Sequence, residues 1–84
     1  MLRIAYSKAA AKQLIRLPSK TAQGLVRKIK AYAANPLGRH PWAKAFGDGI
    51  LRIRQGNYRA LCEIDHEADT LFVHEIGDRK EIYR

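Results

Sequence analysis

Six side chains in the C-terminal half of the chain are of the types that bind and cleave phosphodiesters. They are Arg52, Arg54, Arg59, Arg79, Lys80 and Tyr83. Arginine stays charged at neutral pH, and its planar fork of donors fits the oxygens of a phosphate. Arginines around one phosphate hold a nucleic-acid backbone and stabilise the negative charge that develops during phosphoryl transfer. Because RNA carries its own nucleophile, the 2′-hydroxyl, we expect such a site to need no metal and no cofactor.

The histidines and the cysteine do not form a metal-binding motif. His40, His66 and His74 lack paired ligand spacing, and Cys62 stands alone. A single cysteine excludes an internal disulfide, which suits a reducing compartment. No apolar run has the length of a signal-peptide core or of a membrane span. We therefore expect a cytoplasmic protein with no membrane partner.

The charge of the chain is unevenly distributed. Residues 1–47 contain ten of the 16 Lys and Arg residues and none of the eight Asp and Glu residues. Self-repulsion of this size destabilises a small domain. The pattern therefore favours a polyanionic partner, either nucleic acid or an acidic protein. The alternative, a basic surface that serves only solubility, is less favoured.

The hydrophobic pattern predicts one α+β domain over residues 1–84. Period-two alternation predicts strands, and apolar stripes at helical spacing predict two helices. Ser7 and Ser19 are candidate N-caps, and Pro18 ends the first helix. The predicted strands are 1–6, 50–54, 58–65 and 70–76. The first predicted helix follows Ser7 and stops at Pro18, and the second follows Ser19 and ends at the Asn35-Pro36 pair. Residues 37–49 are predicted to be a loop, with Trp42 and Phe46 holding it against the body.

The predicted order is β-α-α-β-β-β, an antiparallel-rich twisted sheet with a helical hairpin on one face. If Leu51 and Ile53 pack under the helices, Arg52 and Arg54 point away from them. Arg59 lies across the hairpin turn of residues 55–57. The segment after Gly77 is expected to fold back, so that Arg79, Lys80 and Tyr83 join the three arginines on the open face.

The residues alone leave a structural interpretation open for each of these groups. Arg52 and Arg54 could be the solvated side of an ordinary strand. Arg59 could pair with Glu63 or Asp65, and Arg79 could pair with Glu75. Tyr83 could simply pack the tail against the body.

Several segments resemble the RelE/ParE superfamily of type II toxin–antitoxin toxins. They are LRIRQGNYRALCEID, LFVHEIGDRKEIYR, the opening SKAAAKQLIRLP, and the Asn-Pro pair after the second helix. Their order matches over essentially the whole chain. The resemblance implies a fold like that of microbial ribonucleases, and an antitoxin whose acidic or amphipathic segment wraps the toxin. Operator DNA would be bound only through that antitoxin.

The resemblance also implies roles for individual residues. RelE-like toxins cleave mRNA in the ribosomal A site, whereas ParE-like toxins inhibit DNA gyrase. In the RelE pattern Arg59 and Arg79 hold the scissile phosphate, and Tyr83 orients the 2′-hydroxyl or stacks on a base. The substrate-binding positions are Arg52, Arg54 and Lys80.

The RelE-like residues favour an mRNA interferase over the two alternatives, a gyrase inhibitor without nuclease activity and a non-catalytic antitoxin-binding member. One departure concerns the proton acceptor. Ile50 stands where the RelE type has a further lysine. The general base is therefore left open among Glu63, His74 and Tyr83.

Overall fold

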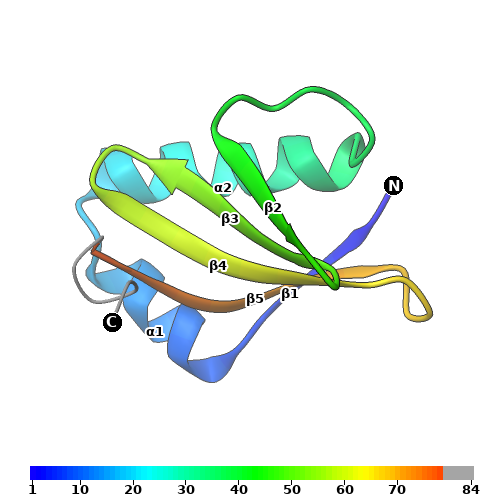
Figure 1. The fold of residues 1–84 in the computed structure, drawn as a ribbon. Helices are drawn as coiled ribbons and strands as arrows, with labels where there is room; N and C mark the ends of the chain where they lie inside the picture. The colour runs from blue at the N-terminus through cyan, green and yellow to red at the C-terminus, as the bar shows by residue number, and fades with distance from the viewer. Residues whose placement is uncertain (79–84) are drawn as a thin grey trace.

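The computed structural model describes residues 1–78, which form one five-stranded sheet and two helices (Figure 1). The strand order is β1-β5-β4-β3-β2, with β1 parallel to β5 and the other pairs antiparallel. The elements are β1 (Arg3–Tyr6), α1 (Lys8–Arg16), α2 (Ser19–Ala34), β2 (Ala43–Gly47), β3 (Ile50–Gln55), β4 (Tyr58–Asp65) and β5 (Thr70–Asp78). The predicted α+β class is confirmed, with one strand more than the sequence indicated.

The two helices differ in how their N-termini are capped. Ser7 caps α1, because its Oγ accepts a hydrogen bond from the Ala10 amide at 2.9 Å. The same hydroxyl donates to the carbonyl of His74 at 2.6 Å, which fixes the start of α1 to β5. The predicted Ser19 cap is wrong, because Pro18 occupies the cap position and Ser19 is already helical. No helix among residues 1–78 is long and apolar enough to cross a membrane.

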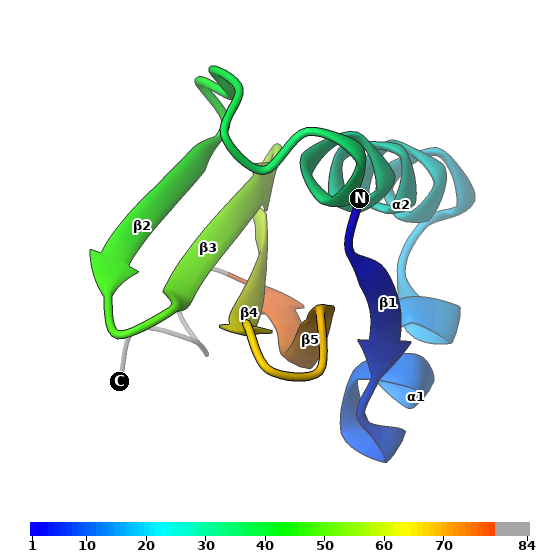
Figure 2. The ribbon, with the colours of Figure 1, turned by 90° about the vertical axis from the view of Figure 1, so that its right-hand side faces the viewer.

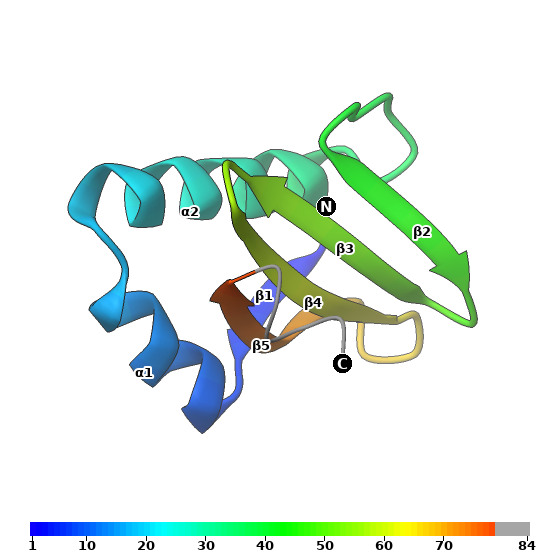
Figure 3. The ribbon, with the colours of Figure 1, turned by 60° about the vertical axis from the view of Figure 1, so that its left-hand side comes forward.

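Both helices lie on one side of the sheet (Figures 2 and 3). Helix α1 packs on β5 and α2 packs on β3, and both reach β1. Alternate residues of β3, β4 and β5 therefore point under the helices and are buried. The fully buried side chains are Ala10, Leu25, Ile29, Ala33, Leu51, Ile53, Ala60, Cys62, Leu71, Val73 and Ile76. Among residues 1–78, no helix covers the opposite face of the sheet.

The prediction of a loop over residues 37–49 is wrong in part, because residues 43–47 form the edge strand β2. Trp42 packs against the core as expected. Phe46 does not hold the segment against the body, since 49% of it is exposed. A period-two pattern was present in Ala43, Lys44 and Ala45, but the glycines around it resemble turn punctuation.

Two glycines shape the surroundings of the β3–β4 turn, one in the turn and one in α2. Gln55 and Tyr58 are paired, and Gly56 has a φ of 60° at the first position between them, which favours glycine. The Gln55 side chain then lies over Gly24 of α2. A Cβ at position 24 would come 2.6 Å from Gln55 Nε2. Gly24 thus lets α2 approach the end of β3 closely.

Removal of the same side-chain atoms from α2 and from α1 should have very different effects on stability. Ile29 is 0% exposed in α2, whereas Ile15 is 83% exposed in α1. Ile29→Ala should lower the free energy of unfolding by about 2–5 kcal/mol, because it removes buried atoms and leaves a cavity. Ile15→Ala should change it by less than about 0.5 kcal/mol. Urea denaturation of both variants measures the difference, and equal losses would contradict the packing described.

Candidate functional site: a basic pocket on the open sheet face

Like charges face one another twice on the open side of the sheet. Arg54 of β3 is directly opposite Arg59 of β4, and Arg52 of β3 is directly opposite Lys44 of β2. Like charges in directly opposed positions destabilise a sheet. An anion held between them would convert this repulsion into attraction. The register therefore points to a binding site for an anion at this place.

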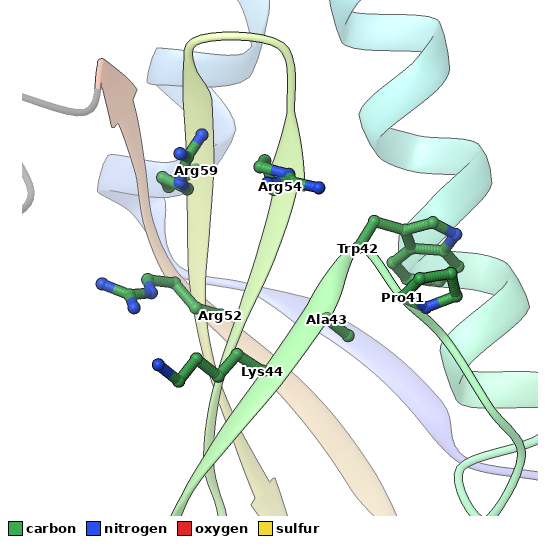
Figure 4. A pocket seen from close by; sticks show the side chains of 7 residues that line it. All are labelled: Pro41, Trp42, Ala43, Lys44, Arg52, Arg54 and Arg59. Carbon is green, nitrogen blue, oxygen red and sulfur yellow. The ribbon is translucent and has the colours of Figure 1, made fainter.

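These four side chains line one pocket of about 170 Å³ (Figure 4). Its wall is completed by Pro41, Trp42 and Ala43. Figure 4 shows Arg54 and Arg59 on neighbouring strands near the hairpin turn, with Arg52 and Lys44 farther along the sheet. The structure thus brings Arg52, Arg54 and Arg59 together as the sequence predicted. We call this site the basic pocket.

Within residues 1–78, the guanidinium group of Arg59 is held by backbone carbonyls and not by a carboxylate. Its Nη1 donates to the carbonyls of Gly56 at 3.0 Å and Tyr58 at 3.1 Å. The alternative pairing of Arg59 with Glu63 is not found, because Glu63 Oε1 lies 2.8 Å from His74 Nε2. Asp65 accepts hydrogen bonds from the amides of its own turn. Arg59 therefore lines the pocket with its guanidinium group fixed by the backbone of the hairpin turn.

Helix α2 adds a cation that the sequence analysis did not assign to the site. Lys28 Nζ donates to the carbonyl of Arg54 at 2.9 Å and lies 5.8 Å from the centroid of the Trp42 ring. Burial, followed by the positive charge of Arg54, lowers the pKa of Lys28. Lys44 is not assigned to the site from the sequence either, because a loop is predicted there. The local sequence signal is the alternation of Ala43, Lys44 and Ala45, and the pairing of Lys44 with Arg52 places it at the site.

Three predicted site residues, Arg79, Lys80 and Tyr83, lie outside the described residues.

Cys62 of β4 is fully buried between β3 and β5, and burial raises the pKa of its thiol to about 12. It is therefore unsuited to act as a nucleophile. Residues 1–78 contain no group of three or more His, Cys, Asp and Glu side chains that could hold a metal ion.

The family model described as "ParE toxin of type II toxin-antitoxin system, parDE" matches residues 4–83. The chain belongs to this toxin family. The match includes the three predicted site residues that follow Asp78. Among curated protein sequences, none matched the chain.

Solved structures with this fold include RelE toxins. The isolated E. coli RelE toxin superposes with a TM-score of 0.79 at 21% identity, covering 93% of this chain and 84% of that one. The RelE chain of the archaeal RelE-RelB complex from Pyrococcus horikoshii OT3 gives 0.78 at 19% identity, covering 93% and 94%. The RelBE2 complex of Mycobacterium tuberculosis gives 0.72 at 23% identity, covering 93% and 98%. At these identities the likeness shows a shared fold.

Removal of one cation from the basic pocket should stabilise the free toxin. Arg54→Thr relieves the repulsion between Arg54 and Arg59, and threonine suits a strand. We expect the free energy of unfolding to rise by about 0.2–1 kcal/mol at low salt, and the gain to shrink at high salt because salt screens exposed charges. The control is Arg3→Thr in β1, where the opposite residue is Thr70. A loss of stability in Arg54→Thr at low salt would argue against an unbalanced cluster.

The buried thiol should make stability depend on pH in the alkaline range. The pKa of Cys62 is raised from 9.0 to about 12 in the folded toxin. The folded state therefore holds its proton where the unfolded state releases it. The resulting stabilisation is complete below pH 9 and is lost as the pH rises toward 12. Between pH 8 and 11, the free energy of unfolding should fall more steeply for the wild type than for Cys62→Ala. Parallel curves for the two proteins would exclude this linkage.

Proposed function

We propose that this toxin is a ribosome-dependent endoribonuclease that cleaves mRNA in the cytoplasm. The observation that carries the proposal is that two opposed pairs of cationic residues line one pocket, Arg54 opposite Arg59 and Lys44 opposite Arg52. Such a cluster is suited to a phosphate whose charge increases in the transition state. The order of its residues is also the one that resembles RelE-like toxins.

In the proposed reaction the 2′-oxygen of the substrate loses its proton to a base and bonds to phosphorus, while the bond to the 5′-oxygen breaks and the 5′-oxygen takes up a proton from the protonated base or from water. The products are a 2′,3′-cyclic phosphate and a 5′-hydroxyl. By the resemblance to RelE-like toxins, Arg59 and Arg79 hold the scissile phosphate, and Tyr83 orients the 2′-hydroxyl or stacks on a base. Arg52, helped by Arg54 and Lys80, completes the positive groove.

A proton acceptor is available on the same face of the sheet. Arginine is a poor base, because its pKa is above about 12. Glu63 and His74 are half exposed, are 2.8 Å apart, and extend from neighbouring strands on the side opposite the helices. Glu63 follows Arg59 by four residues on β4, which is roughly 13 Å along a strand. These two groups and Tyr83 are the candidates for removing the 2′-proton.

We further propose that a cognate antitoxin neutralises the toxin. Solved relatives with this fold include RelE–RelB complexes from Pyrococcus horikoshii OT3 and E. coli, at 19% and 22% identity. The uninterrupted basic charge of residues 1–47 suits an acidic or amphipathic antitoxin segment. Operator DNA would be reached through that antitoxin.

A second candidate is inhibition of DNA gyrase without nuclease activity. It is favoured by one observation, that the matching family model is named for ParE and the parDE system. A supercoiling assay with purified gyrase distinguishes the two functions. Inhibition by the wild type, with mRNA intact during growth arrest, would support the gyrase function and exclude the nuclease.

Replacement of Arg59 should remove the activity while leaving the fold. Arg59→Ala should lower the rate of mRNA cleavage roughly 100- to 1,000-fold, the usual effect of losing one charge-stabilising donor. Primer extension on translated mRNA after induction measures the cuts, which should be codon-phased. The matched control is Arg16→Ala, at the exposed end of α1 on the helical side of the molecule.

Three outcomes are informative. Codon-phased cuts that disappear in Arg59→Ala and persist in Arg16→Ala support the proposal. Cuts that persist unchanged in Arg59→Ala would remove this arginine from the reaction. Normal growth on expression of the chain alone, with uncut mRNA and active gyrase, would indicate a non-catalytic member of the family.

A further inference from the structure

Phe46 is a large apolar side chain that the fold leaves uncovered. About half of it is exposed, and it does not belong to the core cluster. It lies in the edge strand β2 at a bulge, since Ala45 is opposite Leu51 and Gly47 is opposite Ile50. Phe46 is therefore the extra residue of the bulge. Bulges of this kind occur next to active sites, where they redirect one side chain.

Two cations of the basic pocket lie against the Phe46 ring. The Cζ atom of Arg52 is 4.4 Å from the ring centroid, and Lys44 Nζ is 5.4 Å from it. Both distances are within the range of cation–π attraction. The same two side chains line the basic pocket. The aromatic ring thus adjoins the pocket through the cations that would hold a phosphate.

We propose that Phe46 is a stacking platform for an unpaired base of single-stranded RNA whose backbone phosphate lies in the basic pocket. This inference rests on the proposed function and specifies its substrate as unpaired RNA. Proteins that bind single strands combine a cationic track for the backbone with aromatic rings for the bases. A base inside a duplex offers no free face to such a ring.

The spacing along β2 suits this arrangement. Lys44 and Phe46 are two residues apart, roughly 7 Å along a strand. Lys44 faces Arg52 on the open side of the sheet, and the ring contacts both cations from that side. A strand of RNA can therefore place a phosphate between Lys44 and Arg52 while the adjoining base lies on Phe46. Stacking of this kind tolerates any base, because every base has a π-face.

A protein segment could also cover an exposed phenylalanine, and the experiment separates the two cases. The probe is a hexamer of 2′-O-methyl RNA, which cannot be cleaved by attack of the 2′-oxygen, with 2-aminopurine at its third position. A second hexamer is abasic at that position and has the same phosphates. Dissociation constants for both are measured with the wild type and with Phe46→Ala, Phe46→Leu and Phe46→Trp.

Phe46→Ala and Phe46→Leu should bind the 2-aminopurine hexamer roughly 5- to 150-fold more weakly than the wild type, the effect of losing one stacked base. Phe46→Trp should retain binding. All variants should bind the abasic hexamer equally, because its phosphates still reach the basic pocket. Quenching of 2-aminopurine fluorescence on binding, present in the wild type and absent in Phe46→Leu, reports the stacking directly. Ile15→Ala, which removes an exposed apolar side chain from α1, is the matched control and should match the wild type.

The results also distinguish this inference from the function on which it rests. If the wild type and Phe46→Ala bind both hexamers equally, the stacking platform is excluded while the basic pocket remains a phosphate site. The exposed ring would then be assigned to contact with a protein segment. If the wild type binds neither hexamer, the platform and the binding of free RNA by the basic pocket are both overturned, whereas the proposed cleavage of ribosome-bound mRNA is decided separately by primer extension. An equal loss for both hexamers in Phe46→Ala would show that the ring supports the cations and does not contact a base.

Discussion

The site depends on one constraint, the register that places cations opposite cations across three adjacent strands. The β3–β4 hairpin fixes Arg54 against Arg59, and the pairing of β2 with β3 fixes Lys44 against Arg52. Neither pair of residues can leave its opposed positions without a shift of strand register. A shift by one residue would turn Leu51 and Ile53 out of the core. Burial on the helical face therefore keeps Arg54 opposite Arg59 on the open face. This like-charge pair, which does not favour folding, is held in place by the hydrophobic contacts beneath it.

The sequence was sufficient for most of the fold because both of its periodicities are clear. The apolar stripes of the helices and the alternation in β3, β4 and β5 each indicate which side of the element is buried. The arginines on the other side of the strands are therefore predicted to lie on the open face. Strand β2 was missed because only its inner residues are small and apolar, while its outer residues Lys44 and Phe46 face solvent at an edge. Its identity depends on pairing with β3, which no local pattern records.

The same reason explains what was missed at the site. Lys44 enters the basic pocket through strand pairing, and Lys28 reaches the backbone of Arg54 beside it through the packing of α2 on β3. Both are contacts between segments distant in sequence. Phe46 was expected to be buried because large aromatic residues usually are. The bulge in β2 leaves it exposed beside two cations. Arg52, Arg54 and Arg59 were predictable because they belong to one hairpin.

The parallel pairing of β1 with β5 has a consequence for synthesis of the toxin. The first strand has its partner in residues 70–73, near the other end of the described chain, and β5 lies between β1 and β4. A growing polypeptide that lacks β5 can form the hairpin of β3 and β4, but β1 has no neighbour to join. Closure across such a long separation is slow relative to local contacts. The molecule therefore cannot complete its sheet until residues 70–73 have been synthesised and can pair with β1.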